Sequence, residues 1–420
     1  MVEKIQHTGQ QRRVGKNTRG RRVVAMNKTY TAAKVGPENR TTTRRRIALF
    51  TNSVAVGGME EHVELLARHL DRSKFEVFSI CPDWEATEPF YKSLALESDH
   101  IAKSTPDRRY GTLKLPSEYL RLYNYLRTWQ IDVMHMHSTT YRGQIGALLM
   151  ARLAGVKRIY VTEHLAPEET LPWFERTTRS IVSRLVDGIV CVSQKNYLAR
   201  AAHIFTPRER TTIVNNGVDL DDFPAIPEET LAALRSTYNL PPGALILGSV
   251  VRFEPEKGLN YLLDALPTIL AACPNTYLLL VGDGSQREAL EEQAARLGVA
   301  DHVRFTGFQS DPRPYLGLID VFVLPVPVGS MSIGLLEAMA MQRAVIITFG
   351  GEGEAVVHGQ SGFCAEPRNP DSIAHFVIQL LQDDTLRQQM GEAARQRIAD
   401  TFSAQQVART LGSLYSAPGS

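Results

Sequence analysis

The sequence predicts an α/β protein with two doubly wound domains that face each other across a cleft. Three observations carry this prediction. Short β-rich runs alternate with helical segments over residues 46–400, a strand–loop–helix series occurs twice, and Asn-Gly and Pro punctuation near residue 225 separates the two series. Strands that alternate with helices at such intervals form parallel sheets with helices on both faces.

The first series begins at Arg46 with a buried strand, a Gly-containing loop and a helix. Val63, Leu66 and Leu70 form one apolar stripe of that helix. A second helix is expected over residues 143–156, with Gly155 placed to end it. The further strand candidates of this half are FEVFSICP, IDVMHMH, RIYVTEH and GIVCVS.

The second series begins with ALILGSVVRFEPEKGLNYLLDALPTIL, and its later strands are TYLLLVGDG, HVRFTGF, VFVLPVPV and AVIITFGG. We expect one Rossmann-like domain over residues 46–225, a second over 226–400, and a terminal helical segment over 401–420. In open α/β sheets, ligands bind at the carboxyl ends of the strands. The loops that follow the strands are therefore the places to look for chemistry.

The charge is divided unevenly along the chain. Residues 1–46 carry a net charge of +11 and the remainder −9, which together give the +2 of the whole chain. Residues 1–45 lack periodic apolar positions and an apolar signal region, so we expect a disordered basic tail that can touch an anionic membrane surface. The tail could instead bind nucleic acid, which we do not expect. It could also be an adaptor-like extension, or the chain could begin at Met26.

No apolar run reaches the roughly 18 residues that a membrane-spanning helix needs. The four cysteines, Cys81, Cys191, Cys273 and Cys364, have no paired spacing. This pattern favours a reducing compartment over a disulfide framework or a structural zinc site. We therefore expect a cytoplasmic protein, with peripheral contact at the inner face of the membrane left open for the tail.

Two cations follow the first strand of the second half. Arg252 stands at the strand end, and Lys257 precedes Gly258 and a helix. An arginine fork, a lysine point charge and helix amides together form a receptor for a diphosphate. A solvated loop in which Glu254 and Glu256 neutralise both cations is the competing interpretation.

The stretch GSMSIGLLEAMA, residues 329–340, is a second candidate. Its small residues leave backbone amides uncovered for a phosphate or sugar, and Glu337 sits in the first turns of a helix. A carboxylate there can accept hydrogen bonds from both hydroxyls of a ribose. It also suits the positive end of the helix dipole, which is a purely structural explanation.

Histidines and glycines mark strand ends of the first half. His135 and His137 alternate onto one face of a strand, and His164 follows the next strand. We expect His137 to form hydrogen bonds or to stabilise charge, because no third ligand at a suitable spacing supports a metal site. Gly57 and Gly58 precede a helix and can admit a phosphate, although the loop is no dinucleotide fingerprint.

Taken together, these segments resemble family-four glycosyltransferases, which are retaining enzymes of the GT-B fold that use nucleotide-sugar donors. The resemblance covers about residues 46–410. It rests on the order of GGMEEHVELLARHL, VNNGVDLDDF, RFEPEKG, VGDGSQREALEEQAARLGVADHVRFTGF, GLLEAMA and GGEGEAVVHGQSGF.

The resemblance implies roles for single residues. Arg252 and Lys257 match the pair that holds the donor diphosphate, Glu337 matches the ribose-binding carboxylate, and His137 matches a histidine near the transferred sugar. The remaining matches are the loop whose amides touch the donor (Met331, Ser332, Ile333), the wall around the base (the Gly282–Gly284 turn, Gly307, Phe308) and the acceptor-side phosphate loop (Gly57, Gly58, with His164 as a further candidate).

The family further implies no cofactor and no bound metal, a saccharide or lipid-linked acceptor, and a C-terminal helix that braces the first domain. The expected activity is sugar transfer with retention of configuration in polysaccharide or glycolipid assembly. The chain departs from the family at one position. Gly329 stands where a glutamate facing the donor sugar is usual, which leaves altered sugar recognition, replacement by Glu352 or Glu354, or a weakened or inactive transferase.

Two alternatives remain beside transfer. A non-catalytic GT-B protein would bind a nucleotide-sugar or a partner enzyme without turnover, and a sugar-nucleotide epimerase would need acid–base carboxylates in the cleft. The acceptor segment TEHLAPEETLPWFERTTR carries Trp173, Phe174 and Arg176–Arg179. It is compatible with a membrane-proximal acceptor and equally with an ordinary amphipathic helix.

Overall fold

The structure is a computed structural model that describes residues 43–52, 57–104, 115–138, 144–165, 172–204, 208–327, 332–349 and 354–417, together with the short strands β1 (Gly15–Lys16) and β2 (Arg22–Val23). The other residues of the basic tail up to position 42 lie outside the described residues, and its last residue, Arg45, already belongs to a strand. Three positions named above, which are Gly329, Met331 and Glu352, also lie outside the described residues.

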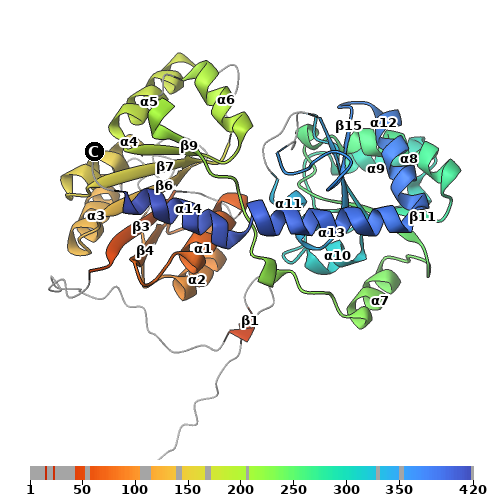
Figure 1. Cartoon of the computed structure of the whole chain (residues 1–420), viewed down its shortest axis with the longest axis horizontal. Coiled ribbons are helices and arrows are strands. Elements are labelled where there is room, and N and C mark those ends of the chain that lie inside the picture. Colours follow the sequence, from red (N-terminus) through yellow and green to blue (C-terminus); the bar gives the residue numbers. More distant parts are fainter. Residues whose placement is uncertain are drawn as a thin grey trace, which may run out of the picture.

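Two parallel sheets form two lobes that lie side by side (Figure 1). The first sheet has the order β5-β4-β3-β6-β7-β8-β9 and the second β12-β11-β10-β13-β14-β15. The first contains β3 (Arg45–Thr51), β4 (Phe75–Cys81), β5 (His100–Lys103), β6 (Val133–Ser138), β7 (Arg158–Glu163), β8 (Gly188–Cys191) and β9 (Thr211–Ile213); the second contains β10 (Leu245–Val250), β11 (Thr276–Val281), β12 (Val303–Phe305), β13 (Val321–Leu324), β14 (Ala344–Thr348) and β15 (Phe363–Ala365).

Every predicted strand is present, and the two doubly wound sheets confirm the predicted fold class. The strands are nearly continuous apolar runs because helices cover both faces of each sheet. In the first lobe, one face carries α1 (Gly58–His69), α2 (Glu88–Glu97) and α14 (Ala404–Ser416), and the other carries α3 (Leu115–Thr128), α4 (Gln144–Leu153) and α5 (Trp173–Leu185), with α6 (Gln194–His203) following β8. Gly155 has φ +88° just beyond α4, as expected of a residue that ends a helix.

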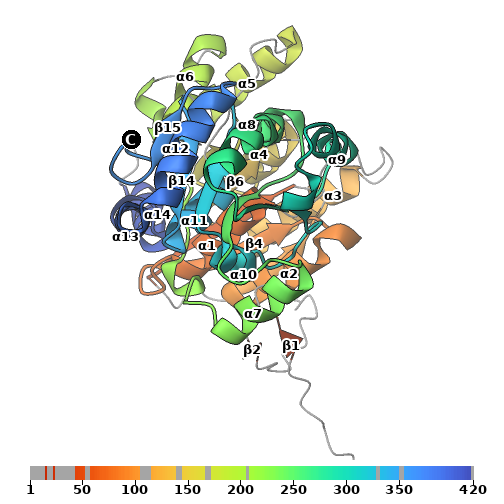
Figure 2. The same ribbon diagram turned by 90° about the vertical axis from the view of Figure 1, so that its right-hand side faces the viewer.

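In the second lobe, α10 (Arg313–Leu318), α11 (Ile333–Ala340) and α13 (Asp384–Thr401) cover one face of the sheet. The other face carries α8 (Leu259–Ala272), α9 (Arg287–Arg296) and α12 (Pro370–Gln382). Figure 2 shows this lobe in front, with α8 and α12 side by side. The short helix α7 (Glu228–Thr237) packs on α10 at the start of the lobe.

The chain crosses between the lobes twice, and the two crossings are bonded to each other. Val218, beyond β9, pairs with Ser403, between α13 and α14, in a parallel bridge. The amide of Val218 donates to Phe402, and the amide of Ala404 donates to Val218, each at 2.9 Å. After the second crossing α14 packs on α1, so the end of the chain completes the core of the first lobe (Figure 1).

In the part of the chain that the structure describes, no helix is long and apolar enough to cross a membrane.

Candidate functional site

The carboxyl edge of the second sheet carries two cations beside a helix N-terminus. Arg252 follows β10 and is exposed, and Lys257 ends the 3-10 turn η5 (Pro255–Lys257) directly before α8. Uncapped helix amides and the positive end of the dipole attract anions, and a guanidinium adds a planar fork of donors. The structure therefore brings these two predicted residues to one edge that suits a phosphate-bearing ligand.

Two glycines let helices approach the strand ends closely. Gly258 has φ +69°, a left-handed conformation that favours glycine, and a Cβ there would overlap the carbonyl oxygen of Pro325 beyond β13. A Cβ on Gly334, in the first turn of α11, would lie 2.6 Å from the carbonyl oxygen of Val250. Consequently α8 and α11 both begin at the carboxyl ends of the central strands, beside the cations.

Glu254, two residues after Arg252, has a hydrogen-bond partner of its own. Glu254 accepts a hydrogen bond from the Ser285 hydroxyl at 2.6 Å, and this bond lowers the pKa of Glu254. Within the described residues, no carboxylate forms an ion pair with Arg252 or Lys257. The charge of Arg252 helps to lower the pKa of Glu254, but no ion pair forms between them, so a loop in which both cations are fully neutralised is not favoured.

The predicted base-binding wall assembles from three successive loops. Gly282, at φ +137°, lies so close to the Val251 carbonyl that no side chain fits there, and its amide donates to Gly307 at 3.0 Å. Phe308 follows and is 77% exposed. An exposed aromatic ring beside bare backbone can stack on a flat ligand. The loop of Arg252 lies against the same turn, because Phe253 donates its amide to Asp283 at 2.9 Å.

Glu337 lies in the second turn of α11, whose N-cap is Ser332 and whose first residue is Ile333. The helix dipole favours acids only within about the first turn. The structural explanation offered above for an acid at position 337 therefore does not account for it. Glu337 is buried to 8% exposure and lines a cavity between the lobes. The other walls of this cavity are Glu61, Glu64, Leu65 and Arg68 of α1, Gly217, Val218, Asp219 and Phe223 of the first crossing, and Ile333.

A cluster of buried histidines lies at the carboxyl edge of the first sheet. His137 is the last residue but one of β6, and its Nδ1 lies 3.2 Å from Nε2 of His164, which follows β7. The ring of His62, one turn into α1, lies 5.1 Å from that of His164 and 5.6 Å from that of His137, centroid to centroid. The prediction missed His62; its signal was its place four residues after Gly58, on the helix that the glycine loop starts.

These histidines are neutral around pH 7. Burial lowers the pKa of His62 to about 4, and burial with the neighbouring imidazoles lowers the pKa values of His137 and His164 well below the usual range. Both ring nitrogens of His62 and Nε2 of His137 have no hydrogen-bond partner among the described residues. Neutral rings with spare hydrogen-bonding capacity suit hydroxyl groups better than they suit a developing charge.

His135 points to the same side of β6 as His137, as the alternation predicts; their ring centroids are 4.2 Å apart. Its Nε2 bonds the Thr162 hydroxyl at 2.7 Å, and its Nδ1 bonds the Tyr415 hydroxyl of α14. His135 therefore joins the histidine cluster to the C-terminal helix and has no nitrogen left for a ligand.

The two edges meet where α1 and α11 begin. An added Cβ on Gly58 would lie 3.0 Å from Cγ1 of Ile333, and the Gly57 amide donates to Glu60 of its own helix at 2.8 Å. The absence of a side chain at Gly58 thus lets the start of α1 in one lobe lie against the start of α11 in the other.

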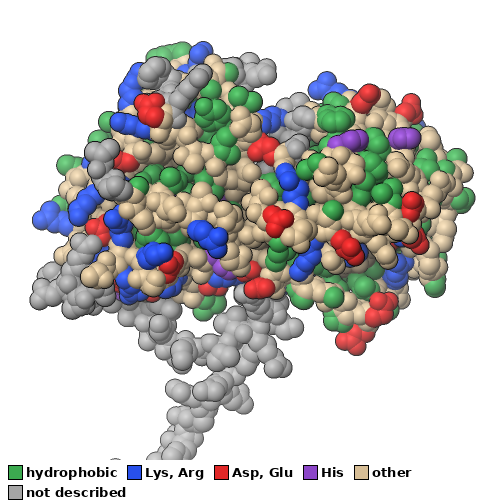
Figure 3. All heavy atoms as spheres, viewed as in Figure 1, with side chains coloured by type: hydrophobic (Ala, Val, Ile, Leu, Met, Phe, Trp, Pro, Cys, Tyr) green, Lys and Arg blue, Asp and Glu red, His purple; other side chains and the backbone are tan. Residues whose placement is uncertain are grey.

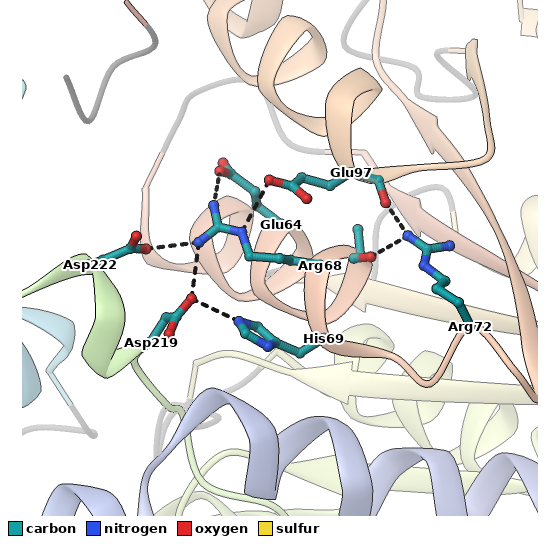
Figure 4. A network of polar contacts seen from close by, with 8 residues as sticks. Glu64, Arg68, His69, Arg72, Glu97, Asp219 and Asp222 are labelled. Atoms are coloured by element: carbon teal, nitrogen blue, oxygen red, sulfur yellow. Dashed lines mark hydrogen bonds and ion pairs between the residues drawn. The ribbon is translucent and has the colours of Figure 1, made fainter. Parts of the chain in front are cut away.

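Ion pairs hold the first crossing segment against α1 (Figure 4). Arg68 of α1 forms ion pairs with Asp222 at 2.8 Å and Asp219 at 3.3 Å, and also with Glu64 and Glu97 at 3.1 Å each. His69 bonds Asp219 at 2.8 Å. From the second lobe, Arg313 and Arg395 donate to backbone carbonyls of the same segment, Asp222 and Phe223.

Glu354 was one candidate to replace the missing acid at Gly329. Its Oε1 accepts from the backbone amide of Lys195, at the start of α6, at 3.3 Å, and burial raises the pKa of Glu354. The carboxylate thus bridges the lobes at the helix N-terminus of α6 in this conformation.

Among the described residues, no three His, Cys, Asp or Glu side chains are grouped so that they could hold a metal ion. The cysteines are free, and burial raises the pKa values of Cys81 and Cys191 to about 12.

Two family models match this chain, one in each lobe. Residues 232–397 match the family model "Glycosyl transferases group 1", and residues 56–222 match "Glycosyltransferase Family 4". The chain belongs to the group 1 glycosyltransferases. The matches divide between the two lobes, so one family model covers the lobe with the cations and the other covers the lobe with the histidines.

The relatives of this glycosyltransferase include enzymes with different names and acceptors. It is 29% identical over 371 residues to the GDP-mannose-dependent alpha-(1-6)-phosphatidylinositol monomannoside mannosyltransferase of Mycobacterium tuberculosis, covering 84% of this chain and 93% of that protein. It is 28% identical over 393 residues to the glycogen synthase of the same organism, covering 86% of this chain and 91% of that protein.

Solved structures share the two-lobed arrangement. Anabaena HepE in complex with UDP and glucose superposes with a TM-score of 0.75 at 19% identity, covering 89% of this chain and 100% of that one. A glycosyltransferase from Rickettsia africae gives a TM-score of 0.76 at 20% identity, covering 89% and 98%. At these identities the likeness establishes the GT-B fold.

Proposed function

We propose that this glycosyltransferase transfers a sugar from a nucleotide-sugar donor to an acceptor hydroxyl with retention of the anomeric configuration, in glycolipid or polysaccharide assembly. One observation carries the proposal. Arg252 and Lys257 stand without a carboxylate partner among the described residues, at the edge where α8 and α11 begin. Two such cations beside two helix N-termini suit a diphosphate whose charge grows as it leaves.

In the proposed reaction the bond from the anomeric carbon to the diphosphate oxygen breaks first. The electron pair leaves with the nucleoside diphosphate, which Arg252, Lys257 and the helix amides stabilise. The acceptor hydroxyl attacks the oxocarbenium-like carbon from the face that the diphosphate leaves, and a phosphate oxygen takes its proton. The protein thus needs no side-chain base, and the groups named here carry the charge that a metal carries in other transferases.

Glu337 is proposed to accept hydrogen bonds from the ribose hydroxyls. Its cavity is lined by Glu61 and Glu64 and also by Arg68, which pairs with Glu64; the lining as a whole is acidic, and this favours hydroxyls over phosphates. The amides of Ser332 and Ile333 are proposed to bind the phosphates, and Gly282, Gly307 and Phe308 are proposed to surround the base. His137 and His164 are proposed to meet hydroxyls of the transferred sugar or the acceptor, since both rings are neutral.

The donor is best sought among GDP-mannose, UDP-glucose and ADP-glucose. The mannosyltransferase relative is GDP-mannose-dependent by its name, and HepE holds UDP and glucose. A thermal-shift screen against these donors identifies the base that binds. Nuclear magnetic resonance of the product then reads the anomeric configuration, and inversion would contradict the proposal.

A non-catalytic donor-binding or scaffold protein is the second candidate. It is favoured by Gly329, at the position where the family has an acid, and by the engagement of Glu354 with α6. This candidate predicts a thermal shift with a donor but neither hydrolysis nor transfer. Release of nucleoside diphosphate at a measurable rate from the purified full chain would exclude it.

A further inference from the structure

A fully buried ion pair lies next to the histidine cluster of the first lobe. Nη1 of Arg200, on α6, pairs with Oε1 of Glu163, the last residue of β7, and the two side chains are 1% and 2% exposed. Arg200 also donates from Nη2 to the hydroxyl of Ser183 on α5. Arginine and glutamate are rarely buried this deeply, because removing a charge from water is costly. What such a pair supplies best is a fixed geometry, since neither partner can move away without leaving a buried charge unpaired.

The pair adjoins a histidine of the cluster in the sequence. Glu163 directly precedes His164, whose Nε2 lies 3.2 Å from Nδ1 of His137. A second contact from α6 holds the same strand end, because Asn196 donates from Nδ2 to the backbone carbonyl of Glu163 at 3.3 Å. Asn196 is itself fully buried, and its Oδ1 accepts from the hydroxyl of Ser193, the N-cap of α6, at 3.1 Å. One helix thus holds both the side chain and the backbone of the residue before His164.

The N-terminus of α6 is also the end of the helix that meets the second lobe. The amide of Lys195 donates to Oε1 of Glu354 at 3.3 Å, and the helix dipole favours a carboxylate at this place. Glu354 is anchored in its own lobe, since Arg397 of α13 donates to the carbonyls of Glu354 at 2.6 Å and Ala355 at 2.7 Å. Figure 1 shows α6 at the side of the first lobe that faces the second, and in Figure 3 the lobes touch across the middle of the molecule.

We propose that the buried contacts from α6 position His164, and that Glu354 of the second lobe ties this position to the arrangement in which the lobes touch. Arg200 and Asn196 are then positioning residues, because they act on His164 only through Glu163. Buried polar contacts cannot exchange their partners for water, so α6 and the end of β7 move as one unit. When the lobes separate, the contact of Glu354 with α6 is lost, and with it the constraint on the histidine.

The consequence for transfer rests on the proposed function, in which His137 and His164 meet hydroxyls of the sugar or the acceptor. A histidine that takes its position only when the lobes touch restricts reaction to that arrangement and leaves the open one free to exchange ligands. The positioning itself does not depend on the reaction, because the ring of His164 can be observed without donor.

The test is nuclear magnetic resonance of the full chain with ¹⁵N-labelled histidines. Glu163→Gln with Arg200→Met removes both charges together, so that neither is left buried and unpaired and the variant can fold. The ring nitrogen signals of His164, identified by their loss in His164→Gln, should shift in this variant because the contact with His137 changes. His302 is the internal reference, since its Nδ1 bonds a backbone carbonyl of the second lobe at 2.9 Å. Unchanged His164 signals in the folded variant would overturn the proposal.

A second buried ion pair of the first lobe gives the matched control. Arg46 and Glu76 pair at 3.0 Å near the amino ends of β3 and β4, with side chains 8% and 11% exposed. Glu76→Gln with Arg46→Met removes similarly buried charges at the edge of the sheet opposite the histidines. The His164 signals should keep their wild-type positions in this variant. Equal shifts in both paired variants would mean that the ring responds to the loss of any buried ion pair, and the positioning role would be refuted.

The link to the second lobe is tested with Glu354→Ala. This change lies in the other lobe, and it should shift the His164 signals in the same direction as the variant without the Arg200 pair. That paired variant should lower kcat about tenfold and leave the KM of the donor near its wild-type value, because His164 does not bind the diphosphate.

Adding Glu354→Ala to the paired variant should lower kcat by less than about a further twofold, since both changes act through α6. His164 signals that do not respond to Glu354→Ala, or losses in kcat that multiply, would overturn the link between the lobes. If the wild type transferred no sugar, the proposed function would fail, and the resonance shifts would still decide whether α6 positions His164.

Discussion

Gly58 of the first lobe lies against Ile333 of the second, with room between them for less than one methyl group. Gly58 begins α1 and Ile333 begins α11, so the contact joins the N-termini of two helices, one from each lobe. We expect the histidine cluster of the first lobe and the cations of the second to act together across this junction, whose width is limited by the absence of a side chain at Gly58.

Filling that junction should impair transfer. Gly58→Leu would press on Ile333 and separate the two helix N-termini, and we expect kcat to fall about tenfold or more, because misplacement of about 1 Å is costly in catalysis. Adding Ile333→Ala should restore most of the loss, since it returns the space and keeps the backbone amide. If Gly58→Leu turned over like the wild type, the closed junction would have no part in the reaction.

Glu337 should matter for the ribose and not for the phosphates. Glu337→Gln should weaken binding of the nucleoside diphosphate by about tenfold to a hundredfold, the range for a lost hydrogen bond to a charged group. The wild type should also prefer the ribose form over its 2′-deoxy analogue, and the variant should lose this preference. Calorimetric titration of both ligands against both proteins measures the coupling. A preference that survives in the variant would place the ribose elsewhere.

The charge cluster at the first crossing should stabilise the fold strongly. Arg68→Met leaves Asp222, whose side chain is fully buried, without its arginine, and we expect a loss of about 3–5 kcal/mol in the free energy of unfolding. Lys92→Met is the matched control, because its ion pair with Glu88 at 3.7 Å is largely exposed and should contribute about 1 kcal/mol or less. Urea titrations compare the two. Equal losses would mean that Arg68 is an ordinary surface charge.

Acid should destabilise the fold through His62. Its pKa is lowered by burial to about 4 in the folded state, below the usual 6.5, so folding favours the neutral ring. The stability that depends on this ring is complete above pH 6.5 and is lost as the pH falls toward about 4, at up to about 1.4 kcal/mol per pH unit. His62→Phe should therefore flatten the pH dependence of the urea midpoint in this range. An unchanged slope would contradict a buried neutral histidine.

The sequence alone predicted most strands of both sheets and the positions of the two cations. The strands are mostly apolar runs, and a parallel sheet puts their carboxyl ends at one edge, so Arg252 and Lys257 could be placed without coordinates. It was insufficient for β5 and β15, which are three or four residues long and carry no distinctive periodicity.

The rest of the candidate site depends on contacts between residues that are far apart in the sequence, and residue spacing does not predict such contacts. His62 resembled any helical residue until α1 placed it beside His137, and Arg68 gained two of its partners from the crossing about 150 residues later. The outward apolar face of α5 was equally hidden. Its residues fit an ordinary amphipathic helix, and the burial of Arg179, Val182 and Ser183 shows which side faces the sheet.

The most direct measurement is the turnover of Lys257→Ala, compared with the wild type at a saturating concentration of the donor that the screen identifies. If Lys257 stabilises the leaving diphosphate, the loss should be about 2–4 kcal/mol in the transition state, or about thirtyfold to a thousandfold in kcat. The melting temperature should stay the same, since no described carboxylate pairs with this lysine. Near-normal kcat in a folded Lys257→Ala variant would contradict the account.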